Sequence, residues 1–95
     1  MYQPTTPPDL LCHWYVVHCQ SGKEWQAASA LESSLDLTAY LPLVKQQFRK
    51  KQQYAPLFPR YLFLHVDLGR TALSKINTTP GVLRVVMFDN IPQPI

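Results

Sequence analysis

The stretch from Leu57 to Val66 constrains the fold of this chain more than any other part of the sequence. Successive residues of a β-strand point to opposite sides of a sheet, so a strand here presents two different rows of side chains. The two rows are aliphatic Leu62, Leu64 and Val66, and aromatic or polar-tipped Tyr61, Phe63 and His65. The aromatic row is either a binding surface that the domain leaves open or core covered by a helix. This stretch alone does not choose between them.

Size and composition indicate one small domain. A chain of 95 residues buries only about 60–65% of its unfolded surface, enough for one sheet with one or two helices. No apolar run approaches the ~20 residues of a membrane span, and no apolar signal segment opens the chain. We therefore expect a cytoplasmic protein with no membrane contact.

The two cysteines, Cys12 and Cys19, do not form a disulfide framework. With His13 and His18 nearby, a zinc site is conceivable. A strand through this segment places His18 and Cys19 on opposite faces, however, so they cannot close on one ion without a break. We expect no metal and no cofactor.

The basic residues are unevenly distributed along a chain of net charge +3. Lys45, Arg49, Lys50, Lys51 and Arg60 follow one another with no acidic residue between them. Such a run is either a solvated hairpin tip or an electrostatic footprint for a phosphate backbone or an acidic partner. Charge alone does not decide which.

Turn signals and periodicity divide the rest of the chain into elements. Ser21 and Glu24 have the spacing of a capping box, which predicts a helix start, and Ala27 and Leu31 continue at helical spacing. Pro42 marks an edge, a bulge or a strand start. The predicted elements are strands at 14–19, 38–48, 57–66 and 82–88, a helix after Ser21, a hairpin tip at 49–53 and a short helix at 71–77.

The order βαββαβ predicts an α+β domain, an α/β plait with a four-stranded, mostly antiparallel sheet and helices on one face. The helices then cover Tyr15, Val17 and Cys19 together with the aliphatic row. The opposite face carries Trp14, Val16, His18, Tyr61, Phe63 and His65, either in open view or under a terminal segment. Such a set is costly to leave in water unless a partner covers it, which favours the binding-surface alternative.

Four blocks of sequence then closely resemble the N-terminal domain of NusG transcription factors. They are Trp14-Tyr15-Val16-Val17, Ser21-Gly22, Phe58-Pro59-Arg60-Tyr61-Leu62-Phe63 and Thr79-Pro80-Gly81-Val82. The segment Tyr40-Leu41-Pro42 and the Leu-Phe-Pro-x-Tyr-Leu-Phe form look more like the specialised RfaH branch. The resemblance implies a disordered tail at 1–11, a NusG N-terminal-like domain at 12–90 and, at 91–95, the start of a linker to a C-terminal KOW domain outside this sequence.

What the resemblance implies for function is an elongation or antitermination factor that binds RNA polymerase as a monomer. It would dock on the clamp helices of the largest catalytic subunit and suppress pausing or termination. The implied polymerase-binding positions are Phe58, Tyr61 and Phe63, with His18 on the first strand. Trp14 joins them because strand alternation places it on the same face.

The resemblance also implies contacts with DNA, the non-template strand in particular. The positions that it implies are Thr78 and Thr79, and Gln20 and Ser21. The basic Lys45, Arg49, Lys50 and Lys51 are further candidates because of their charge, and would lie near DNA or an acidic polymerase surface. Two departures from RfaH matter. A His-Thr-Thr run, with which RfaH contacts the opposite pincer of the polymerase, is replaced here by Ala72-Leu73-Ser74, which argues against a bridge across the cleft by that contact. A basic pair with which RfaH holds DNA is replaced by Gln20-Ser21.

The sequence pattern is also compatible with a different class of binding domain. An RRM-like module for single-stranded RNA has the same element order and stacks bases on aromatic residues of its open sheet. The strand after Arg60 echoes that pattern but lacks its glycine. An enzyme is disfavoured, because His13, His18 and His65 have no acidic or nucleophilic neighbour at a convincing spacing. We expect no catalytic residue.

Overall fold

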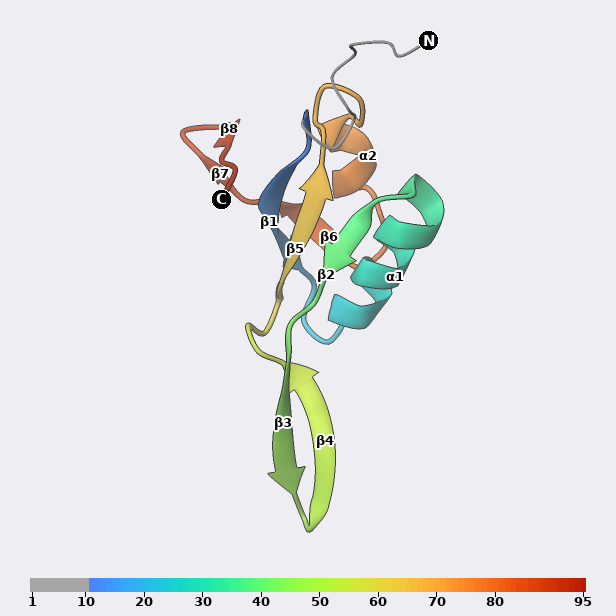
Figure 1. Ribbon diagram of the computed structural model, residues 1–95, viewed down its shortest axis with the longest axis vertical. Coiled ribbons are helices and arrows are strands. Elements are labelled where there is room, and N and C mark those ends of the chain that lie inside the picture. The colour runs from blue at the N-terminus through green and yellow to red at the C-terminus, as the bar shows by residue number, and fades with distance from the viewer. Residues whose placement is uncertain (1–10) are drawn as a thin grey trace, which may run out of the picture.

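The computed structural model describes residues 11–95, so the predicted tail 1–11 lies almost entirely outside the described residues. Ten elements follow one another in this part of the chain (Figure 1). They are β1 (His13–Cys19), α1 (Glu24–Leu35), β2 (Thr38–Tyr40), β3 (Leu43–Phe48), β4 (Lys51–Pro56), β5 (Tyr61–Val66), α2 (Leu73–Asn77), β6 (Val82–Val85), β7 (Met87–Phe88) and β8 (Ile91–Pro92).

The central sheet has four strands in the order β2-β5-β1-β6, and every neighbouring pair is antiparallel. The pairing of β1 with β5 sets Tyr15 opposite Leu64 and Val17 opposite Leu62. Residues directly opposite each other in a ladder share a face. The aliphatic rows of the two central strands therefore combine into one apolar surface, and the predicted α/β plait is confirmed.

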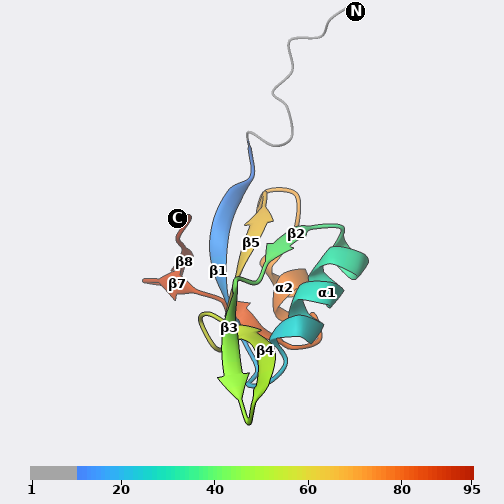
Figure 2. The same ribbon diagram turned by 60° about the horizontal axis from the view of Figure 1, so that its bottom comes forward.

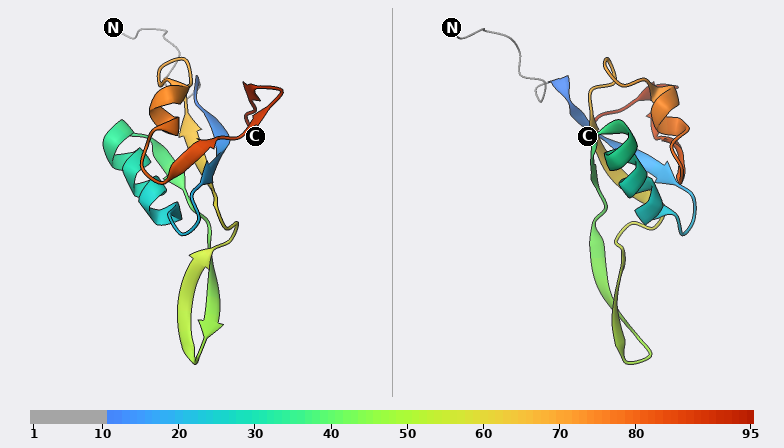
Figure 3. Two further views of the ribbon diagram at one scale, coloured as in Figure 1. Left: turned by 180° about the vertical axis from the view of Figure 1, so that it is seen from behind. Right: turned by 90° about the vertical axis from the view of Figure 1, so that its right-hand side faces the viewer.

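Both helices lie on this apolar surface of the sheet, as the side view of Figure 3 shows. Helix α1 packs beside β2 and β5, and α2 packs beside β6. The fully buried core contains Val17, Cys19, Ala27, Leu31, Leu62, Leu64, Ile76 and Val85. Gly81, at φ +87°, makes the close approach possible, because a Cβ there would lie 2.9 Å from the Ala27 nitrogen and the Lys23 carbonyl oxygen.

The predicted second strand, 38–48, is two strands rather than one. β2 belongs to the central sheet, whereas β3 pairs only with β4 in a separate hairpin that projects away from it (Figures 1 and 2). Pro42 lies between them and has no N–H to donate to a ladder. Its carbonyl accepts a hydrogen bond from the Leu57 N–H at 2.8 Å, which closes the base of the hairpin.

The hairpin turns more tightly than the predicted tip at 49–53. Arg49 and Lys50 form the two-residue connection, with φ of +50° and +66°, the geometry that matches the twist of paired strands. The strand predicted to start at Leu57 begins at Tyr61, because residues 57–60 form a turn.

The predicted fourth strand also ends early. β6 stops at Val85, and the chain then reverses through Asp89 and Asn90, both at positive φ, to pair β7 with β8. Residues 91–95, in which we expect a linker to begin, fold back on the domain: the Ile95 N–H donates to the Trp14 carbonyl at 2.8 Å. The further domain beyond that linker stays a prediction. Within residues 11–95, no helix has the length and hydropathy needed to span a bilayer.

Candidate docking face and basic hairpin

The sheet surface opposite the helices is a continuous band of ring-bearing side chains, which we call the aromatic face. Cross-strand pairing sets Trp14 opposite His65 and His18 opposite Tyr61, while Phe63 lies between Val16 and Tyr40. These pairs gather the side chains predicted from strand alternation and add an aromatic residue from β2. The aromatic face comprises Trp14, Val16, His18, Tyr40, Phe58, Tyr61, Phe63 and His65.

The rings of this face contact one another in a chain. Trp14 and His65 have ring centroids 4.8 Å apart, and His18 stacks on Tyr61 at 5.0 Å with an interplanar angle of 17°. Phe63 and Phe58 make an edge-to-face contact with ring centroids 6.1 Å apart, and the Tyr40 ring lies 6.3 Å from that of Phe63. Aromatic pairs at these separations hold each other in place. The face is therefore pre-arranged before any partner binds.

The rings remain accessible to a partner despite these contacts. Trp14 is 38% exposed, Tyr61 39% and Phe58 48%, whereas Leu62 and Leu64 on the opposite side of β5 are fully buried. Trp14, Tyr40, Phe63 and Ile95 line an open apolar hollow of about 290 Å³. The alternative in which a helix covers the aromatic row is wrong for this fold, because both helices lie on the other side of the sheet.

The turn that carries Phe58 is held by a buried carboxylate. Glu24, only 5% exposed, accepts a hydrogen bond from the Arg60 backbone N–H at 2.9 Å through Oε2. Arg60 is at φ +73°, and its carbonyl accepts from the Cys19 N–H at 2.7 Å. The predicted capping box is therefore wrong: Lys23 is the N-cap of α1, no side chain caps it, and Glu24 reaches across to the turn instead.

The His18 end of the face carries positive charge. Arg84 of β6 lies directly opposite His18 in the ladder, and Arg60 precedes Tyr61 in the chain. Burial, followed by the charges of Arg60 and Arg84, lowers the pKa of His18 below its ordinary value. The imidazole is thus neutral near pH 7, and the two guanidinium groups carry the charge.

The other potentially reactive group, Cys19, is inert. Burial and the nearby Glu24 carboxylate raise the pKa of the Cys19 thiol to about 11. A thiol in that state is a poor nucleophile and a poor metal ligand. Among residues 11–95, no three His, Cys, Asp or Glu side chains come together in a group that could hold a metal ion.

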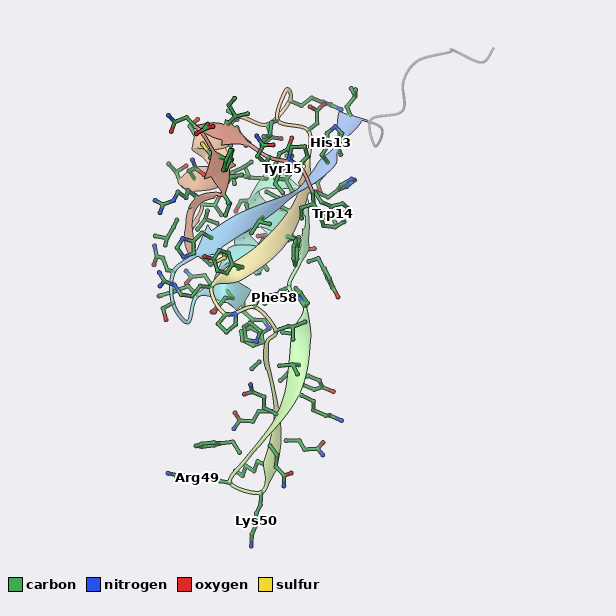
Figure 4. All side chains as sticks on the ribbon, turned by 90° about the vertical axis from the view of Figure 1, so that its left-hand side faces the viewer. His13, Trp14, Tyr15, Arg49, Lys50 and Phe58 are labelled. Carbon is green, nitrogen blue, oxygen red and sulfur yellow. The ribbon has the colours of Figure 1, made fainter. Side chains whose placement is uncertain are left out.

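The β3–β4 hairpin presents the predicted basic run to solvent. Lys45, Arg49, Lys50 and Lys51 are all exposed, and Figure 4 shows Arg49 and Lys50 at its far end. Arg49 lies over the Phe48 ring at 5.3 Å, and the Lys45 ammonium lies 5.9 Å from the Tyr54 ring. A cation within about 6 Å of a ring centroid is attracted to the ring face, so each ring helps to position its basic side chain.

The remaining predicted DNA-binding residues fall at two loops. Gln20 and Ser21 are exposed in the turn between β1 and α1. Thr78 is exposed after α2, and its hydroxyl donates to the Ser74 carbonyl at 2.7 Å. Thr79 is buried, and its hydroxyl donates to the Lys75 carbonyl at 2.8 Å. Thr78 rather than Thr79 therefore has the surface position that a nucleic-acid contact needs.

Sequence reasoning missed four residues of this region: Tyr40, Arg84, Ile95 and Glu24. Tyr40 and Arg84 join the face through strand register, which alternation within one strand does not reveal. Ile95 reaches the hollow only because the chain reverses at Asp89 and Asn90. No local signal could have paired Glu24 with Arg60, 36 residues away.

The fold and the accessible aromatic face define a class of protein: a small α/β-plait domain with one sheet face left uncovered by its helices. The family model described as "Transcription termination factor nusG" matches residues 12–95. The chain belongs to the NusG family of transcription factors. A solved structure reporting domain interaction in Thermotoga maritima NusG has the same fold, with a TM-score of 0.65 and 20% identity over 88% of this chain and 50% of that one. This chain thus corresponds to half the length of that structure.

Proposed function

We propose that this domain binds RNA polymerase by docking its aromatic face on the clamp helices of the largest catalytic subunit, and that it thereby suppresses pausing or termination. Membership of the NusG family supports a role in transcription. The observation that carries the proposal is the set of pre-arranged but exposed rings on one sheet face. A pair of helices offers the long, ridged apolar surface that such a face can bury.

The binding energy would be concentrated in a few rings. Phe63 and Phe58 lie near the middle of the face, Trp14 lies at one end, and the stacked pair of His18 and Tyr61 lies at the other. Truncating a central aromatic anchor of an interface costs ~2 kcal/mol or more. Loss of two such anchors, ~4 kcal/mol together if their effects add, therefore weakens binding by roughly 700-fold or more.

The basic hairpin and the exposed loop residues extend the proposal to DNA. Lys45, Arg49, Lys50 and Lys51 would lie along a phosphate backbone, with Gln20, Ser21 and the Thr78–Thr79 loop near the non-template strand. Charges of this kind raise the rate of association more than the affinity. Replacing the four basic residues should slow association and flatten its salt dependence while leaving dissociation from polymerase nearly unchanged.

The test is binding to purified core RNA polymerase, with wild type compared with Tyr61→Ala/Phe63→Ala. Tyr54→Ala is the matched control, because Tyr54 is also exposed but lies on the hairpin, away from the face. Circular dichroism confirms folding of each variant. We expect wild type and Tyr54→Ala to bind at both low and high salt and the double variant to fail. Loss of binding in the control to the same extent would contradict docking through the aromatic face.

A transcription assay tests the direction of the effect. Addition of the wild-type domain to polymerase on a template with a pause and a terminator should shorten the pause and raise read-through. The double variant should do neither. Lower read-through with wild type would contradict the RfaH-like, antitermination part of the proposal while leaving polymerase binding intact.

The second candidate is an RRM-like module for single-stranded RNA, which the open aromatic sheet face favours. The two candidates differ in their response to salt. RNA binding weakens steeply as salt rises because counterions are released from the phosphates, whereas burial of apolar rings is nearly insensitive to salt. Binding of an oligonucleotide, but not of polymerase, would establish this second candidate.

A further inference from the structure

One end of the aromatic face combines rings with two arginines. His18 stacks on Tyr61, Arg84 lies opposite His18 on the neighbouring edge strand, and Arg60 precedes Tyr61. Both arginines are exposed, and both are close enough to His18 for their charges to act on its imidazole. The Trp14 end of the face, in contrast, has an apolar hollow lined by Trp14, Tyr40, Phe63 and Ile95. The face therefore has an apolar end and a cationic end.

The two guanidinium groups have no partner of opposite charge within residues 11–95. Glu24, which contacts the turn that carries Arg60, is buried and accepts from the backbone N–H of Arg60 rather than from its guanidinium. No ion pair between described residues involves Arg60 or Arg84. Guanidinium groups are planar donors that match carboxylates and phosphates in a forked, two-bond geometry.

We propose that the His18 end of the aromatic face is a carboxylate-binding subsite, which receives an acidic side chain carried by the docked helix beside its apolar stripe. This inference rests on the proposed function and specifies the partner's chemistry. Apolar side chains of the helix fill the Trp14 end, and an aspartate or glutamate reaches Arg60 and Arg84. The charge pair fixes which way the helix lies along the face, since a reversed helix would set that carboxylate in the apolar hollow.

The surroundings favour a protein carboxylate over a nucleic-acid phosphate at this subsite. A nucleic-acid backbone is tracked by a row of cations, and the row in this chain lies on the hairpin, whose tip projects away from the sheet. His18 adds no charge here, because its lowered pKa keeps the imidazole neutral. His18 and Tyr61 also cover one ring face of each other, which leaves less ring surface for a base. Protein–protein interfaces have an apolar core surrounded by a polar, solvent-accessible rim in which arginine is common. Two exposed arginines beside packed rings have this arrangement.

The experiment compares Arg84→Glu and Arg60→Gln with wild type for binding to core RNA polymerase. Arg70→Glu is the control, because Arg70 is an exposed arginine in the turn beyond the other end of β5, and its reversal changes net charge as Arg84→Glu does. We expect Arg84→Glu to weaken binding about tenfold and Arg60→Gln severalfold, through faster dissociation, and Arg70→Glu to have less than a twofold effect.

Charge-reversal rescue then identifies the partner group. Each acidic residue of the clamp helices is replaced in turn by lysine, and the resulting polymerases are tested against wild type and Arg84→Glu. One lysine substitution should weaken wild-type binding and restore binding of Arg84→Glu. If no substitution restores it, the carboxylate subsite is wrong.

The outcomes separate this inference from the docking proposal. If Tyr61→Ala/Phe63→Ala abolishes binding but Arg84→Glu behaves like Arg70→Glu, docking stands and the subsite is refuted. If wild type does not bind polymerase, both are refuted. If a short single-stranded RNA binds instead and Arg84→Glu loses it, the subsite holds phosphate rather than carboxylate, and the proposal is overturned.

Discussion

Replacing Glu24 by alanine should destabilise the domain by about 2 kcal/mol, since a hydrogen bond with one charged partner contributes ~1.5–3 kcal/mol. The bond at stake joins the Glu24 carboxylate to the Arg60 N–H at 2.9 Å, and Glu24 is 5% exposed. Water therefore does not easily replace the lost acceptor. The turn also depends on it, because Arg60 is held at a left-handed φ of +73° that non-glycine residues disfavour.

In a domain of this size, 1 kcal/mol shifts the melting temperature by roughly 4–8 °C. Glu24→Ala should therefore lower it by roughly 8–16 °C, measured by circular dichroism at neutral pH. Glu24→Gln keeps an amide oxygen as acceptor and should lose about half as much. Glu32→Ala is the control: Glu32 is an exposed carboxylate on the same helix and should change stability by no more than about 0.5 kcal/mol.

A structural consequence accompanies the loss of stability. The Arg60 amide should exchange with solvent deuterium faster in Glu24→Ala than in Glu32→Ala, because its acceptor is gone. Phe58, carried on the same turn, should lose its fixed edge contact with Phe63. The contrary result is melting of the two variants within about 2 °C of each other, with the Arg60 amide still protected from exchange. In that case the Glu24–Arg60 hydrogen bond does not stabilise this turn.

Three further predictions concern the interior and the face. Gly81→Ala should cost about 3 kcal/mol in chemical unfolding, because the added Cβ meets backbone atoms at 2.9 Å and the residue is at φ +87°; a loss below 1 kcal/mol would contradict the close approach. The lowered pKa of His18 means that the unfolded chain binds this proton more tightly, so stability falls as pH drops through about 6.5 towards the folded pKa. His18→Gln should reduce the drop in melting temperature between pH 7.5 and pH 5.5, and an unchanged drop would count against this origin. In a Cys12→Ser background, Cys19 should react with a thiol reagent at pH 8 only after unfolding, given its burial and a pKa of about 11; rapid labelling of the folded protein would show the burial to be wrong.

The sheet and the face were predictable because strand alternation is a local property. Leu62 and Phe63 alternate within one strand, and the same holds for Val17 and His18. Once the element order placed both strands in one sheet, their apolar rows had to meet under the helices. The structure confirms this arrangement, in which Leu62 and Val17 are fully buried while Phe63 and His18 lie on the other side.

The features that the sequence predicted wrongly or missed share a physical cause, because each is determined by a residue far away in the sequence. Ser21 and Glu24 have the spacing of a capping box, but the Arg60 amide offered Glu24 a better donor from another element. From the sequence alone, Pro42 could mark a sheet edge, a bulge or the start of a strand. Only the pairing of β2 with β5, and of β3 with β4, made it the break between two sheets. Cross-strand register likewise brought Arg84 to the face.

The length of the hairpin separates the two charged regions of the molecule. β3 is six residues long, and a strand rises ~3.4 Å per residue, so the Arg49-Lys50 turn lies roughly 20 Å from the base of the hairpin. That distance is about two and a half times the Debye length at physiological ionic strength, ~8 Å. The charge of a polyanion bound at the turn is therefore largely screened from Arg60 and Arg84. Mechanical coupling between the two ends has to pass through the base of the hairpin, where the Leu57 N–H donates to the Pro42 carbonyl and the two connecting segments enter the domain.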